Sequence, residues 1–317
     1  MGKVLTIGEP MGMFIASAEG KLKDVKHFER YVAGAEMNVS VGVSRLGHDI
    51  SYITEVGQDP FGESVLDFLE AEGIDTSNVK VNPTLPTGFL LKSKDSENDP
   101  EVVYFRKGSA ASKMGPEKAA AVEFGGVDIF HVTGILMALN DGTFELVKSL
   151  ILKAREQGTV ITFDPNLRPS LWASRELMVS RLNEIAGLAD YVLPGIGEGE
   201  VLAGTSNQEE IADFYLEKGA KAAIIKTGPA GAFAKWRTDQ GYEQVFVPGF
   251  KLKQVVDTVG AGDGFAAGVL TGILEGLSME QILERANAIG AIQVSHISDN
   301  ENLPTPARLA DFIAYRM

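Results

Sequence analysis

The chain has 317 residues, and its 29 basic and 43 acidic side chains give it a formal net charge of −14. This acidic balance disfavours non-specific nucleic-acid binding, and the absence of cysteine excludes disulfides, thiolate zinc sites and a cysteine nucleophile. No apolar run reaches the ~20 residues of a membrane span, so we expect a globular, cytoplasmic protein that binds small molecules rather than nucleic acid or membrane.

Short runs rich in β-branched residues alternate with helical stretches along the chain. Helices over 38–46 and 62–72 follow the first two strands, and each ends at a glycine, Gly47 or Gly73, that suits a helix C-cap. The alternation predicts an α/β fold with a doubly wound, mostly parallel sheet and helices on both faces, in one domain over 1–317. The strands are expected at 4–7, 50–53, 129–132, 160–163, 191–193 and 223–225.

Two segments interrupt this alternation, residues 11–32 and 87–106. Both read as antiparallel β excursions without helices, and we expect them to form a small lid over the mouth of the main sheet. The exposed apolar face and free strand edges of such a lid predict coverage by a second subunit, so we expect a homo-oligomer, a dimer or larger.

The most informative stretch is Asp257-Thr258-Val259-Gly260-Ala261-Gly262-Asp263, which precedes an apolar helix reaching about Leu274. Small residues at a helix start expose backbone N–H groups that favour a phosphate or a developing anion. Asp263 is then either a helix-capping group or a general base for a hydroxyl that attacks a γ-phosphate. The permissive glycine pattern of a dinucleotide loop also fits residues 262–267, but its place near the C-terminus disagrees with that interpretation.

Residues 257–263 resemble the C-terminal signature of the ribokinase-like sugar kinases, the PfkB family, and residues 33–40 and 55–62 resemble its N-terminal signature. The resemblance implies a ribokinase-like kinase that uses ATP and Mg²⁺, with Asp263 as the base and Gly260, Ala261 and Gly262 as an anion hole. By the same resemblance, Glu198 contacts the magnesium ion through water. The residues that the resemblance assigns to the nucleotide site are Lys226, Thr227, Gly228, Gly231, Gly260, Gly262 and Asn287. From the residues alone, 226–231 reads as a hairpin turn, and Asn287 is as often a packing residue.

Residues 34–39 and 104–110 resemble the members of the family that phosphorylate 2-keto-3-deoxygluconate on its 6-hydroxyl. Arg106 ends a lid strand and Arg168 follows a sheet strand, so together they are suited to clamp a carboxylate by bidentate hydrogen bonds. A neutral sugar does not need such a clamp. The resemblance implies an acceptor site of Gly34, Asn38, Phe89, Tyr104, Arg106 and Arg168.

The sequence departs from family patterns at several places. Phe89 stands where some of these kinases have tyrosine, and residues 8–12 lack the aspartate with which many neutral-sugar kinases bind hydroxyls. Residues 295–299 replace the usual glycine-containing turn near the family's monovalent-cation site, so the sequence leaves open whether this protein binds a monovalent cation. The alternatives are a fructokinase or other neutral-sugar kinase, a non-catalytic sugar-acid or nucleotide sensor, and a NAD-dependent dehydrogenase. The four histidines, which show no metal-ligand spacing, are His27, His48, His131 and His296.

Overall fold

A computed structural model describes residues 2–94, 100–256, 258–295 and 299–315. Its larger sheet has seven parallel strands, and an antiparallel hairpin extends one edge, so the predicted doubly wound, mostly parallel architecture is confirmed. From one edge to the other the strands are β13 (Gly241–Pro248), β12 (Gly231–Thr238), β11 (Ala222–Lys226), β10 (Tyr191–Val192), β9 (Val160–Asp164), β8 (Ile129–Thr133), β1 (Lys3–Ile7), β4 (Asp49–Gly57) and β5 (Val79–Asn82).

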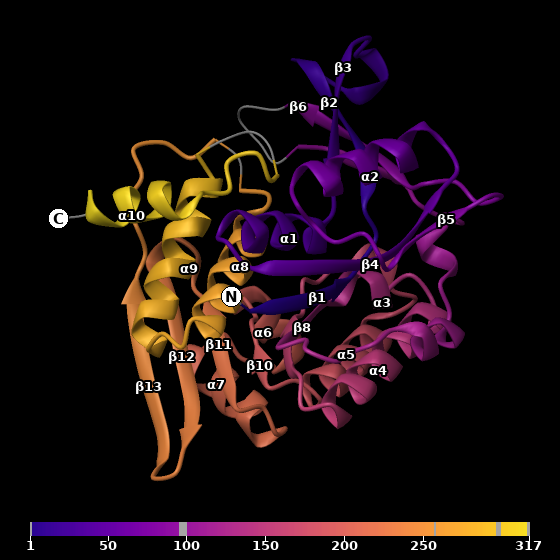
Figure 1. The fold of residues 1–317 in the computed structure, drawn as a ribbon. Helices are drawn as coiled ribbons and strands as arrows, with labels where there is room; N and C mark the ends of the chain where they lie inside the picture. Colours follow the sequence, from indigo (N-terminus) through magenta and orange to yellow (C-terminus); the bar gives the residue numbers. More distant parts are fainter. Residues whose placement is uncertain (1, 95–99, 257, 296–298, 316–317) are drawn as a thin grey trace.

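Helices cover both faces of this sheet, and each face has its own apolar core (Figure 1). One face is covered by α3 (Gly134–Met137), α4 (Asp141–Glu156), α5 (Arg175–Ala186), α6 (Ile196–Leu202) and α7 (Gln208–Glu217). The other is covered by α1 (Ala35–Arg45), α2 (Pro60–Ala71), α8 (Ala261–Leu274), α9 (Met279–Gln293) and α10 (Pro306–Ala314). Within the described residues, the helices are all too short or too polar to cross a bilayer.

Local capping chemistry sets the helix ends. α2 begins two residues before its predicted start, because the Asp59 carboxylate accepts hydrogen bonds from the N–H groups of Phe61 and Gly62. The predicted C-terminal glycines lie just beyond their helices in the left-handed region, Gly47 at φ +89° and Gly73 at φ +69°.

The two excursions form one four-stranded sheet, here called the small sheet, with β3 (Phe28–Ala33), β2 (Met11–Glu19), β6 (Phe89–Lys94) and β7 (Val102–Phe105) in that order. Each hairpin is antiparallel, as predicted, but β2 and β6 join the hairpins in parallel. In Figure 1 this sheet rises from the end of the large sheet.

The two faces of the small sheet differ in composition. The inner face carries a small apolar cluster that includes Met11, Met13 and Leu90. On the outer face Phe89 stacks on Phe105 with ring centroids 4.6 Å apart. Phe105 is nonetheless 48% exposed, because β7 is an edge strand. The outer face is therefore an apolar surface that the described part of the chain covers only partly.

Candidate active site

A pocket of about 290 Å³ lies where the carboxyl ends of the parallel strands meet the small sheet and the start of α8. Glu9 follows β1, Asp164 ends β9 and Lys226 ends β11, and all three side chains line this pocket. β1 lies between β4 and β8, and the strand order runs in opposite directions on its two sides, so the sheet reverses its winding at β1. Open α/β sheets bind their ligands at such a switch point.

The start of α8 forms one wall of the pocket. Its N-cap, Gly260, has φ +80°, and a Cβ at this position would lie 2.5 Å from the carbonyl oxygen of Asp299. No side chain caps this helix in the described chain. The Ala261 N–H lies 3.5 Å from the Thr258 carbonyl oxygen, so the N–H groups of Gly262 and Asp263 are the ones left for a ligand. Gly260 and Gly262 line the pocket, and this wall is suited to bind an anion.

Asp263 lies in the first turn of α8, but it does not cap the helix. Its Oδ2 accepts a hydrogen bond of 2.8 Å from Asn38 Nδ2 on α1, the only bond that this carboxylate makes within the described chain. The capping interpretation is therefore wrong. Burial raises the Asp263 pKa to about 7, although the bond from Asn38 lowers it. A carboxylate with that pKa is suited to accept a proton near neutral pH.

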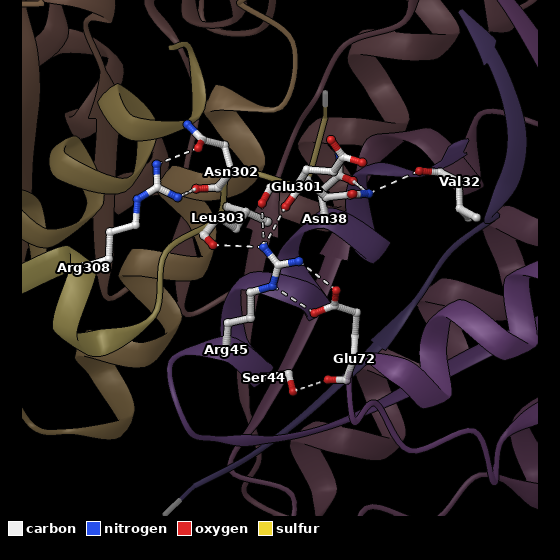
Figure 2. Close-up of polar contacts among 10 residues, drawn as sticks. Val32, Asn38, Ser44, Arg45, Glu72, Glu301, Asn302, Leu303 and Arg308 are labelled. Carbon is white, nitrogen blue, oxygen red and sulfur yellow. Dashed lines mark hydrogen bonds and ion pairs between the residues drawn. The ribbon is translucent and has the colours of Figure 1, made fainter. Parts of the chain in front are cut away.

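The Asn38 side chain is itself held in place by Asn300. The side-chain amide of Asn300 donates to Asn38 Oδ1 at 3.1 Å and to the carbonyl oxygen of Val32 at 3.2 Å. Arg45 holds the segment around Asn300, donating to the carbonyl oxygens of residues 300, 301 and 303 while its guanidinium also pairs with Glu72 (Figure 2). The Asp263 carboxylate is thus oriented by a chain of hydrogen bonds that joins α1 to residues 300–303.

Lys226 ends β11 and lies beside the start of α8, where its Nζ would be 3.8 Å from a Cβ built on Gly262. Its Nζ lies 2.6 Å from Asp164 Oδ2 and 3.8 Å from Glu198 Oε2. Burial lowers the pKa of this amine, but the two carboxylates raise it more, so the group stays protonated. Glu198 accepts hydrogen bonds from the backbone N–H groups of Leu167 and Gly195, which leaves it suited to contact a metal through water.

The two predicted clamp arginines differ in their surroundings. Arg106 is 7% exposed, and its Nε donates to Glu9 Oε2 at 2.7 Å. Arg168 is exposed, and within the described residues its guanidinium donates only to the neighbouring carbonyl oxygen of Leu167. Both arginines line the pocket, as do Gly34 and Tyr104. Apart from Phe89, the structure therefore brings the predicted acceptor residues together, with one cation buried in the pocket and one exposed at its rim.

The prediction that Phe89 lines the acceptor site is wrong. Side chains alternate between the faces of a strand, and Phe89 packs on the outer face of the small sheet against Phe14, Phe61 and Phe105. Its neighbour Leu90 lines the pocket instead.

Part of the predicted nucleotide site has structural roles in the described chain. A Cβ on Gly231 would overlap the carbonyl oxygen of Val247, so glycine is needed to form the β12–β13 hairpin. The Asn287 amide donates to that same carbonyl at 3.0 Å and is buried. Thr227 and Gly228 lie beside this hairpin, outside the residues that line the pocket. Gly231 and Asn287 thus have roles in the hairpin, but the Thr227 hydroxyl is buried without a hydrogen-bond partner in the described chain, and nucleotide contact at these four positions stays a prediction.

Several pocket residues were not predicted from the sequence. Glu9 and Glu36 are buried, and Glu36 accepts a hydrogen bond from the Thr133 hydroxyl. Asn166 lines the pocket with φ +40°, the one non-glycine residue of the described chain at positive φ. The Asp-Pro-Asn sequence after a strand was an available signal for it. The interpretations placed on Asp257 and on residues 296–298 lie outside the described residues.

Comparison with known proteins gives a consistent result. Residues 1–306 match the family described as pfkB family carbohydrate kinase. Over 311 residues the chain is 45% identical to a 2-dehydro-3-deoxygluconokinase of Bacillus subtilis, a match that covers 98% of this chain and 95% of that protein. A 2-dehydro-3-deoxygluconokinase of Thermoproteus tenax is 32% identical over 99% of this chain and 94% of its own length.

Among solved structures, the crystal structure of a putative ribokinase II from E. coli in complex with ATP and Mg²⁺ has a TM-score of 0.88. It shares 27% identity and covers 99% of this chain and all of its own. The predicted ribokinase-like fold is therefore confirmed.

The close approach at Gly260 gives a stability prediction. Gly47 has a similar φ but no heavy atom of the described chain within 4 Å of a built Cβ. Gly47→Ala should therefore cost only the left-handed backbone penalty, about 1 kcal/mol. Gly260→Ala adds the contact with Asp299 and should cost about 2–4 kcal/mol. Urea denaturation of both variants measures this difference, and equal losses would contradict the close approach.

Proposed function

This chain belongs to the PfkB family of carbohydrate kinases, and on that premise we propose that it transfers the γ-phosphoryl group of ATP to the 6-hydroxyl of 2-keto-3-deoxygluconate. The products are 2-keto-3-deoxy-6-phosphogluconate and ADP. The observation that carries the proposal is one pocket that joins a base with a pKa of about 7 to two arginines suited to a carboxylate. The two 2-dehydro-3-deoxygluconokinase relatives, similar over nearly the whole chain, support this acceptor.

The chain's own residues supply positioning and charge for the transfer. Asp263 accepts the proton as the 6-hydroxyl oxygen forms its bond to the γ-phosphorus, while the bond from that phosphorus to the β,γ-bridging oxygen breaks. Asn38 keeps the Asp263 carboxylate in place during this step. The N–H groups at the start of α8 stabilise the charge on the transferring phosphoryl group. Lys226 adds a fixed positive charge beside this turn.

The residues present fit Mg²⁺ held mainly by phosphates and water. Within the described chain no three His, Asp or Glu side chains gather as a dedicated metal site. Asp164 and Glu198 line the pocket, but their oxygens already accept bonds from Lys226 and from backbone N–H groups. Mg²⁺ commonly keeps several waters when it binds with a nucleotide, so these two carboxylates would hold its water shell. When bound, the ion neutralises phosphate charge.

Asp263→Asn tests the base. The variant should fold and bind ATP but lose about 10²–10⁴-fold in turnover, the usual contribution of a positioned base. Its unfolding temperature at pH 8 should be no lower than that of wild type. The raised folded-state pKa means that ionised Asp263 destabilises the fold above pH 7, and asparagine removes that cost. Near-normal turnover would remove Asp263 from the mechanism.

The same pKa predicts a pH profile. Asp263 acts as a base only when it is deprotonated, so kcat/KM for the acceptor should fall about tenfold per pH unit below pH ~7 and level off above it. Measurement from pH 5.5 to 9 at saturating ATP checks this. A flat acid limb would contradict the assignment.

The acceptor is tested by ADP release with 2-keto-3-deoxygluconate, 2-keto-3-deoxygalactonate, fructose, ribose and gluconate. We expect the highest kcat/KM for 2-keto-3-deoxygluconate. Arg168→Ala should raise the KM for that acid about 10–100-fold and leave the KM for ATP unchanged, and Arg168→Lys should restore little because lysine lacks the planar fork. Arg181→Ala, which breaks an ion pair with Asp141 outside the pocket, is the matched control. Preference for fructose would favour a neutral-sugar kinase.

We also propose that the outer face of the small sheet is covered by a second copy of the chain. Wild type should then be a dimer or larger by light scattering at micromolar concentration, and Phe105→Glu should shift it to monomer by burying a charge in the contact. Tyr242→Glu, at a similarly exposed aromatic on β13, an edge strand of the large sheet, should leave the assembly intact. A monomeric wild type would contradict this.

A further inference from the structure

We propose that Glu9 is a positioning residue for acceptor recognition: it holds one edge of the Arg106 guanidinium so that the other edge faces the substrate carboxylate. The inference rests on the proposed function and deepens it, because it assigns acid specificity to a pair of residues and not to a single arginine. Neither signature of the family resemblance includes Glu9, and the phosphoryl-transfer step does not use it.

The contacts of Glu9 account for both of its oxygens. Oε2 accepts from Arg106 Nε at 2.7 Å and lies 2.5 Å from Nη2, while Oε1 accepts from the Ser109 hydroxyl. All three side chains are buried, and Glu9 is 3% exposed. Each carboxylate oxygen is therefore committed, and Glu9 has little freedom to turn toward the substrate.

The free edge of Arg106 follows from guanidinium geometry. Five N–H groups lie in one plane, and Glu9 occupies the edge that carries Nε and Nη2. Nη1 has no hydrogen-bond partner within the described chain, and Arg106 lines the pocket. Nη2 is buried and makes only the ion contact with Glu9, so Nη1 is the group that is left to donate to a substrate carboxylate oxygen.

The charge of Glu9 also protects this arrangement from a competing carboxylate. Glu36 lines the same pocket; its burial raises its pKa, Arg106 lowers it, and Glu9 raises it again. Loss of the negative charge of Glu9 removes one of the causes that raise the Glu36 pKa and leaves Arg106 without its partner. Arg106 can then pair with Glu36, although burial still disfavours ionised Glu36. Arg106 would then turn from the acceptor, so loss of Glu9 should weaken binding of the acid.

The test is a double-mutant cycle on Glu9→Gln and Arg106→Ala, read by ADP release with 2-keto-3-deoxygluconate and ATP varied separately. Glu9→Gln should raise the KM for the acid by about tenfold or more, with a smaller change in kcat and an unchanged KM for ATP. The double variant should match Arg106→Ala within about twofold, since Glu9 acts only through Arg106.

Two further variants separate positioning from general loss of stability. Ser109→Ala removes one bond to Glu9 and should raise the acid KM in the same direction by about threefold, so it decides the matter if Glu9→Gln does not fold. Glu55→Gln breaks another largely buried glutamate ion pair, with Lys118, outside the pocket, and should leave both KM values unchanged.

Three results overturn the inference. They are multiplicative effects of Glu9→Gln and Arg106→Ala on the acid kcat/KM, equal losses for acid and ATP in Glu9→Gln, and an unchanged acid KM in both Glu9→Gln and Ser109→Ala. If wild type phosphorylates fructose but no sugar acid, the proposed function itself is wrong. That result appears in the wild-type measurements alone, so the two failures are distinguishable.

Discussion

The hydrogen bond between Asn38 and Asp263 is the contact on which the site depends, because it joins residues 225 positions apart at the point where a proton must move. Burial of a carboxylate is unfavourable, and the bond from Asn38 offsets part of that cost while it fixes the oxygen's direction. The packing of α1 against α8 brings the two side chains together. A glycine on α1, Gly42, lies directly against Ala267 on α8 and permits this approach.

The electrostatics of the pocket follow one pattern. The two cations deepest in the pocket are each paired with a buried carboxylate that follows or ends a strand, Arg106 with Glu9 and Lys226 with Asp164. Such pairs keep the cations charged and oriented without a large net positive field in an acidic protein. Recognition of two anionic substrates then depends on the direction of individual donors more than on overall charge.

Local patterns in the sequence predicted much of this architecture, and their limits have physical causes. Strand runs, the glycines after α1 and α2, and the bare first turn at 260–263 are all determined by nearby residues, and the structure has them where expected. The prediction for Phe89 was wrong because successive side chains of a strand point to opposite faces of the sheet. An assignment made by resemblance that is off by one residue therefore moves a side chain from the pocket to the outer face. The partnership of Glu9 with Arg106 has no local signal, since the two residues are 97 positions apart.

Arg45 binds the carbonyl oxygens of residues 300, 301 and 303, so the site is completed only when the late-translated part of the chain is present. Asp263, the first turn of α8 and the segment that holds Asn38 all belong to the last fifth of the chain, whereas their partners on α1 are translated first. Until that last part leaves the ribosome, the side of α1 around Gly42 that packs on α8 has no helix to cover it. A nascent chain therefore carries an uncovered helix face and lacks the proposed base, so completion of the fold and onset of the proposed activity coincide.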